Sequence, residues 1–215
     1  MKKVSKCLVF CFCLFLTLFV CYQTVVAEEK KPVKTDDAIN KASVAQSATI
    51  SSMQDIMART MPRAEKIKEI TGMKKGVLLD VGCGGAYLDI ALAKITDMDF
   101  ILLDISPRAI EAASQNIAEH YLEKRARTLL ADVHSIPLPD NSVNIVISTS
   151  SIGLWKNPQQ GLEEIYRVLA PGGRVYISGI GGNAYRDYFG ILKNAGVKRY
   201  ALNKDGGDIW IDIWK

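Results

Sequence analysis

Residues 77–87 read Val-Leu-Leu-Asp-Val-Gly-Cys-Gly-Gly-Ala-Tyr, a stretch that predicts a strand, a tight turn and the start of a helix. The apolar run before Asp80 does not alternate with polar residues, which is typical of a parallel strand covered on both faces. Gly82 and Gly84 permit backbone angles and close approaches that a side chain would prevent. Because a strand, glycine turn and helix in this order present backbone N–H groups to a ligand, we expect a binding site here.

This turn differs from two common phosphate-binding loops. A dinucleotide-binding G-x-G-x-x-G fingerprint needs a third glycine, and the chain has Tyr87 at that position. The bulky ring argues against a nucleotide-binding dehydrogenase, which we keep as an alternative. A P-loop needs Gly-Lys followed by Ser or Thr, and the sequence contains no such tripeptide.

The remaining pattern, Asp-x-Gly-x-Gly-x-Ala, resembles the first motif of the class I S-adenosylmethionine-dependent methyltransferases. The likeness extends over Leu79–Gly85, and it is closest to small-molecule, type 11-like methyltransferase domains. Ala86 stands where that family often has glycine, and we expect only a slight shift of the turn. Residues 169–175, Leu-Ala-Pro-Gly-Gly-Arg-Val, resemble the family's turn into the fifth strand.

The resemblance covers residues 73–215 and implies an α/β, Rossmann-like domain. Its sheet is expected to have seven mostly parallel strands with helices on both faces. The sequence itself predicts how the sheet ends, since residues 197–202 and 209–214 have the composition of strands. The glycine-containing segment 203–207 joins them, so we predict a C-terminal antiparallel hairpin.

Two further strands are expected to end in acids. Asp104 lies about twenty residues after Gly84, the spacing at which a βαβ unit brings a carboxylate to a ribose. The alternative is that Asp104 caps the helix that starts at Pro107. The resemblance gives Asp132, after the third strand, a bond to the adenine amino group, with Val133 packing on the ring. The alternative for Asp132 is a turn acid.

The resemblance therefore implies S-adenosylmethionine as cofactor. The residues that it places around this cofactor are Asp80, Gly82, Cys83, Gly84, Asp104, Ile105, Asp132, Val133 and Ser148. Trp155 and Tyr185 are predicted to line the substrate pocket, although Trp155 could equally belong to the core.

No catalytic residue is assigned. Methyl transfer from an electrophilic sulfonium needs positioning more than acid–base chemistry, so a base is optional. Tyr185, Asp187, Tyr188 and His134 are the candidates, and none is preferred. We expect no metal site, because the chain has two histidines and no cysteine cluster. Cys83 is interpreted as a small apolar filler of the turn in preference to a reactive thiol.

The charge balance gives no reason to expect a nucleic-acid partner. The chain has 27 basic and 23 acidic residues, and without Lys2, Lys3 and Lys6 the count is 24 against 23. After the strand at 143–147 the chain reads Ser-Thr-Ser-Ser, not the Asn/Asp-Pro-Pro-Tyr of enzymes that methylate adenine or glutamine nitrogens. We therefore predict methyl transfer to a small-molecule acceptor. The alternative is a non-catalytic module that binds S-adenosylmethionine or a related nucleoside.

Residues 1–27 are predicted to be a signal peptide or an N-terminal membrane anchor. Three lysines precede an apolar run at 8–21, and cleavage is plausible before Glu28. The domain is then expected on the extracytoplasmic side, with membrane contact only through an uncleaved leader. Because S-adenosylmethionine is made in the cytosol, an exported enzyme would need an imported donor, which is the reason to keep the non-catalytic alternative.

The segments between leader and sheet are expected to be a linker at 28–50 and two helices at 51–72. Thr60 is predicted to cap the second of these helices, with Pro62 in its first turn and Gly72 at its end. These helices cover either the cofactor site or only the sheet edge. Further helices are expected at 107–123, from Pro158 onward and at 185–194. In the first of them Ile110, Ala113, Ile117 and Tyr121 should face inward and His120 outward.

Overall fold

The computed structural model describes residues 53–181 and 187–215. The predicted leader, the linker and Tyr185 lie outside these ranges. The elements are α3 (Met53–Thr71), β1 (Lys75–Val81), α4 (Tyr87–Ile95), β2 (Asp97–Asp104), α5 (Pro107–Glu119), β3 (Ala126–Leu130), β4 (Val143–Thr149), the 3₁₀ turn η1 (Ile152–Leu154), α6 (Pro158–Val168), β5 (Leu169–Ser178), α7 (Tyr188–Asn194), β6 (Arg199–Asp205) and β7 (Asp208–Trp214).

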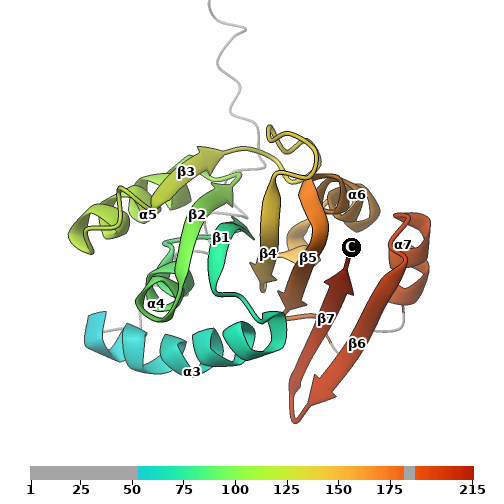
Figure 1. Ribbon diagram of the computed structural model, residues 1–215, viewed down its shortest axis with the longest axis horizontal. Helices are drawn as coiled ribbons and strands as arrows, with labels where there is room; N and C mark the ends of the chain where they lie inside the picture. The colour runs from blue at the N-terminus through green and yellow to red at the C-terminus, as the bar shows by residue number, and fades with distance from the viewer. Residues whose placement is uncertain (1–52, 182–186) are drawn as a thin grey trace, which may run out of the picture. The chain divides into compact units, whose positions relative to one another are not determined.

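Seven strands form one sheet in the order β3-β2-β1-β4-β5-β7-β6 (Figure 1). The first five are parallel, whereas β7 runs antiparallel to both β5 and β6. The predicted architecture is therefore confirmed, including the C-terminal hairpin. Strand β1 lies between β2 and β4, so the glycine turn that follows it is central in the sheet.

Helices cover both faces of the sheet, and successive strand residues face opposite layers. Leu78 packs with side chains of α3, α4 and α5, whereas Leu79 packs with side chains of α6 and α7. Both leucines are fully buried. Burial on both sides explains why the run before Asp80 is apolar without alternation.

The strand register brings the predicted site together at one edge. Val81 pairs with Leu103, and Asp104 pairs with Leu130. The carboxyl ends of β1, β2 and β3 therefore lie side by side, with the glycine turn, Asp104 and the segment after Leu130 at the same edge. Ligands bind at this edge in open α/β sheets.

The prediction of two helices at 51–72 was wrong. Helix α3 is continuous from Met53 to Thr71, and Pro62 lies inside it. Thr60 does not cap a helix, since its Oγ1 donates to the carbonyl of Ile56 at 2.6 Å. Pro62 withholds only one backbone N–H group from the helix, and its side chain is exposed, so burial of the opposite face at Ile67 keeps the helix intact.

Helix α5 is shorter than predicted. It ends at Glu119, and Tyr121 takes a positive φ of 57° and is 89% exposed, so it does not face inward. His120 is half-buried, and its Nε2 atom is buried without a hydrogen-bond partner, so the expectation of a solvent-facing ring was also wrong. Ala113 and Ile117 are buried as predicted.

The connection between β3 and β4 contains no helix, and Val133 and Ile136 from this segment join the core beside α6. The Pro-Gly-Gly sequence at 171–173 lies within β5 as a bulge, because the pairing shifts between Val143 and Ile145. Among the helices of the described ranges, none combines the length and the apolar character needed to cross a bilayer.

Candidate functional site at the carboxyl edge of the sheet

The turn after β1 has the left-handed backbone angles that its glycines predict. The φ values are +83° at Gly82, +54° at Gly84 and +61° at Ala86. A Cβ on Gly82 would lie 2.6 Å from the Cβ of Ser151, so no larger residue fits there. Ala86 adopts the left-handed conformation despite its methyl group, which keeps the turn in the shape that a glycine would give.

Asp104 holds this turn in place. Its Oδ2 accepts a hydrogen bond from the Gly84 N–H at 3.0 Å, and its Oδ1 accepts one from the Ser106 N–H at 2.9 Å. Ser106 itself caps α5 through its side chain, so the alternative role of Asp104 as the cap is wrong. Each carboxylate oxygen can accept a further bond, so Asp104 can still bind a pair of ligand hydroxyl groups.

The first turn of α4 begins at the same edge, directly after the glycine turn. Its N-cap position is occupied by Ala86, which offers no side-chain oxygen to the free backbone N–H groups. The partial positive charge of a helix N-terminus therefore adjoins the glycine turn. Together with the bare backbone at Gly82 and Gly84, it forms a cradle that suits a ligand with polar, oxygen-rich groups.

Asp80 does not lie at the surface of this cradle. It is 2% exposed and lies beneath the turn with Asp89 of α4, which is equally buried. Burial, and next the neighbouring charge of Asp89, raise the pKa of Asp80 well above its ordinary value. Burial raises the pKa of Asp89 to about 7, although the nearby Asp80 carboxyl acts against this shift. Burial therefore favours the protonated form of both acids, and sequence reasoning missed Asp89.

Asp132 lies at the same edge, after β3, with 40% of its side chain exposed. Its Oδ1 accepts from the backbone N–H of His134 at 2.9 Å and meets the ring Nδ1 of His134 at 2.5 Å. Partial burial raises the pKa of Asp132, but these two bonds outweigh burial and the net shift is downward. Asp132 is thus an ionised acceptor whose Oδ2 has no hydrogen-bond partner among the described residues.

Both ring nitrogens of His134 have hydrogen-bond partners. The Asn157 backbone N–H donates to Nε2 at 3.1 Å, and Nδ1 meets Asp132. With neither nitrogen free, His134 is not available as the base that the sequence left open. Tyr188, a second candidate, is buried at 5% exposure, and burial raises its pKa, whereas Asp187 is exposed.

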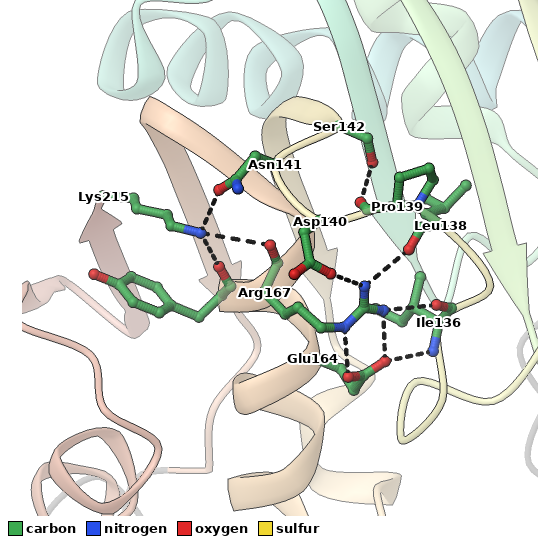
Figure 2. A network of polar contacts seen from close by, with 10 residues as sticks. Ile136, Leu138, Pro139, Asp140, Asn141, Ser142, Glu164, Arg167 and Lys215 are labelled. Carbon is green, nitrogen blue, oxygen red and sulfur yellow. Dashed lines mark hydrogen bonds and ion pairs between the residues drawn. The ribbon is translucent and has the colours of Figure 1, made fainter.

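Helix α6 fixes the loop that carries Asp132, and Figure 2 shows the contacts. The Arg167 guanidinium donates to the carbonyls of Ile136 and Leu138 at 2.8 and 2.9 Å and to Asp140 at 2.7 Å. Glu164 pairs with Arg167 at 2.8 Å and accepts from the Ile136 N–H at 2.9 Å. Sequence reasoning missed both residues, since nothing local marks a helix side chain as the support of a loop about 30 positions away.

The other predicted cofactor residues differ in their access to the edge. Ile105 is 54% exposed beside Asp104, as a residue that contacts a ligand must be. Val133 is 5% exposed and packs in the core cluster that includes α6. Ser148 is fully buried, and its hydroxyl donates to the Val81 carbonyl at 2.9 Å. Cys83 is buried, and burial raises the pKa of its thiol, which agrees with a filler.

Trp155 packs on α6 at Gly161, where an added Cβ would lie 2.8 Å from the ring. The ring is half-buried against the core, so the structure assigns it a packing role and leaves part of it accessible. Tyr185 lies outside the described residues. Within residues 53–181 and 187–215, no group of three or more His, Cys, Asp or Glu side chains is placed to hold a metal ion.

Comparison with known proteins finds sequences similar to this chain. Residues 79–177 match the family described as a methyltransferase domain. The chain is 34% identical over 116 residues to the arsenite methyltransferase of Halobacterium salinarum, covering 53% of this chain and 29% of the relative. It is 30% identical over 138 residues to the ubiquinone/menaquinone biosynthesis C-methyltransferase of Geotalea daltonii, covering 60% of this chain and 59% of the relative.

A solved structure resembles nearly the whole described chain. The candidate S-adenosyl-L-methionine-dependent methyltransferase of Methanococcus maripaludis superposes with a TM-score of 0.72 at 27% identity, covering 86% of this chain and 95% of that one. The chain spans less than two thirds of the length of the two curated relatives above.

Proposed function

We propose that this protein transfers a methyl group from S-adenosylmethionine to a small-molecule acceptor, because residues 79–177 match the methyltransferase-domain family and the fold resembles that of an S-adenosyl-L-methionine-dependent methyltransferase. The observation that carries the proposal is the bond between Asp104 and Gly84. It joins the predicted ribose acid to the glycine turn, so that one carboxylate and one bare backbone face the same space.

The chain's own residues would bind and orient the donor. Asp104 would accept from the ribose hydroxyls and Asp132 from the adenine amino group, while Ile105 offers apolar contact beside them. The cradle of Gly82, Gly84 and the α4 N-terminus would receive the amino-acid end. When bound, S-adenosylmethionine supplies an electrophilic methyl group.

Catalysis then rests on holding the acceptor atom near that methyl group, and a water-poor site favours the loss of charge in the transition state. No general base is required for acceptors that are already nucleophilic. This agrees with the engagement of His134 and the burial of Tyr188.

The curated relatives support methyl transfer as the reaction, but they do not point to a single acceptor. One is named an arsenite methyltransferase and another a C-methyltransferase of ubiquinone/menaquinone biosynthesis, so methyl transfer is common to them and the acceptor differs. Leu154, which follows β4 and is 76% exposed, gives this side of the edge an apolar character. We propose a small acceptor with an apolar part.

Calorimetric titration of the purified protein tests the proposal. S-adenosylmethionine should bind with micromolar affinity and NAD should not bind. Transfer of labelled methyl groups to an extract of small molecules should follow. Preference for NAD would overturn the assignment, whereas binding without transfer to any acceptor would support the non-catalytic alternative.

We further propose that residues 1–27 direct the domain to the extracytoplasmic side. The basic and apolar pattern of the leader supports this location, and it is also the reason to keep the non-catalytic alternative. Fractionation of the native cells, with sequencing of the mature N-terminus, tests it. A mature chain that begins at Glu28 is expected if the leader is cleaved, and a cytosolic chain that retains Met1 would contradict the proposal.

A further inference from the structure

The unusual feature at the base-binding side of the edge is the position of His134 between two partners. It lies two residues after Asp132 and reaches the segment that enters α6 at Asn157. Its side chain is 15% exposed, so most of the ring is packed against the protein, although the bond from Asn157 lies at the surface. The two contacts join the loop after β3 to the segment after β4.

The donor at Asn157 fixes the protonation of the ring. A backbone N–H can only donate, so Nε2 of His134 must be the unprotonated, accepting nitrogen. In the neutral ring the proton then lies on Nδ1, which donates to Oδ1 of Asp132. The tautomer follows from these two contacts without any assumption about a ligand.

In this arrangement both hydrogen bonds from His134 end on Oδ1 of Asp132, so Oδ2 remains available to a ligand. Oδ1 receives two donors from His134, the backbone N–H at 2.9 Å and the ring at 2.5 Å. Two donors on one oxygen hold the plane of the carboxylate, so Oδ2 is held in one direction. An exposed aspartate without such support would sample several rotamers and would lose side-chain conformational entropy when it binds a ligand.

We propose that His134 is a positioning residue that aims Oδ2 of Asp132 at an exocyclic amino group, and that it thereby sets the preference for a 6-amino over a 6-oxo purine. The inference rests on the proposed function, since it takes Asp132 to face the base. A 6-oxo purine presents an acceptor to Oδ2, which a fixed carboxylate repels and a mobile one can avoid. The fixed orientation of the Asp132 carboxylate therefore allows it to discriminate between a 6-amino and a 6-oxo purine.

Two substitutions separate this role from simple support of the loop. His134→Asn keeps an amide N–H near the position of Nδ1 and loses the acceptor for Asn157. His134→Gln keeps a carbonyl near the position of Nε2 and loses the donor to Asp132. Each variant removes one of the two side-chain bonds, so loss of loop support alone predicts similar behaviour.

The measurement is the dissociation constant of S-inosylhomocysteine divided by that of S-adenosylhomocysteine, a ratio that is large when the site prefers the 6-amino purine. We expect His134→Asn to keep the ratio of the unaltered protein, and His134→Gln to lower it roughly 2- to 10-fold, the range that one hydrogen bond supplies. Equal ratios in both variants would overturn the inference. Absence of any S-adenosylhomocysteine binding by the unaltered protein would instead overturn the proposed function.

A second measurement uses the unaltered protein, so its outcome does not depend on whether a variant folds. Nitrogen-15 spectra of the histidine rings in the unaltered protein should show His134 protonated on Nδ1 and not on Nε2. The same tautomer should persist when S-adenosylhomocysteine is bound. A proton on Nε2 would contradict the contact with Asn157 and, with it, the inference.

Discussion

Asp80 and Asp89 illustrate how the tertiary environment changes the chemistry of single residues. Both are 2% exposed, and neither carboxyl oxygen of Asp89 has a hydrogen-bond partner in the described chain. Their pKa values are raised, so the folded protein binds protons that the unfolded chain releases above about pH 4. The free energy of unfolding therefore falls as the pH rises from about 4 to about 7 and beyond.

Asp89→Asn tests this acid pair. The amide keeps the shape of Asp89 and can donate to Asp80, but it carries no charge at any pH. We expect the variant to be more stable than the unaltered protein by about 1–3 kcal/mol at pH 8, with a smaller difference at pH 5. Urea unfolding at both pH values measures the effect, and a difference that is independent of pH would show that Asp89 does not titrate in this range.

Asp104→Ala tests the ribose assignment. The change removes a charged acceptor, so binding of S-adenosylmethionine should weaken by about 1–3 kcal/mol. Glu111→Ala is the matched control, because Glu111 is an exposed acid on α5. Unchanged affinity in Asp104→Ala, measured by calorimetry, would refute the assignment.

At the scale of elements, α6 is the support of the base-binding loop. No helix connects β3 to β4, so the loop after Asp132 has no element of its own to rest on. Arg167 and Glu164 supply that support from one side of α6, while Asn157 at its start binds His134. The hydrogen bond from Arg167 lowers the pKa of Glu164, so the pair loses its stabilising effect only in acid.

Arg167→Met should loosen this loop. Methionine keeps the apolar stem and loses the donors to Ile136, Leu138 and Asp140, so we expect a loss of about 1–3 kcal/mol of stability. Affinity for S-adenosylmethionine should fall as well, because the loop carries Asp132. Thermal unfolding and calorimetry measure the two effects, with Arg127→Met on the exposed side of β3 as control. Full affinity in Arg167→Met would show that the loop is held by other contacts.

Helix α3 contains Pro62 in its interior, and the helix does not require a proline there in order to form. Pro62 lies in the interior of the helix and is exposed. Pro62→Ala restores one backbone hydrogen bond, at some entropic cost through a more flexible unfolded chain. We expect a net gain of about 1–2 kcal/mol, seen as a higher melting temperature. A lower melting temperature would mean that the proline shapes a bend that packing requires.

At the scale of the whole molecule, the position of β7 makes the C-terminal strands necessary for the stability of the sheet and its core. This strand lies between β5 and β6, and its residues Ile209, Ile211 and Ile213 are buried. Lys215 adds bonds from its Nζ to Asn141 and to the carbonyl of Tyr166 (Figure 2). The last residues thus complete the core and do not merely extend the sheet.

Deletion of residues 208–215 should therefore abolish cooperative unfolding, since it exposes β5 and removes three buried isoleucines worth about 1.5–3 kcal/mol each. A graded version is Ile211→Ala, which should cost about 2–5 kcal/mol. Lys204→Ala, at an exposed position near the hairpin turn, is the control. Urea unfolding followed by circular dichroism measures all three, and a cooperative transition in the deletion variant would contradict the prediction.

The sequence by itself determined the features that depend on near neighbours. The apolar run and glycines at 77–87 predicted the central strand and turn, the residues at 203–207 predicted the hairpin, and the spacing of Asp104 from Gly84 predicted that this acid follows the next strand of a βαβ unit. These patterns work because strand burial, turn angles and βαβ geometry each involve a short stretch of chain.

Only the tertiary structure decided which of the predicted polar groups are free. It buried Asp80 with Asp89, directed the hydroxyl of Ser148 to Val81 and engaged His134 between Asp132 and Asn157. It also made α3 continuous and placed α6 beneath the loop after β3. The physical reason is that burial and hydrogen-bond partners come from segments brought together by the sheet, and no local pattern records which segments will meet.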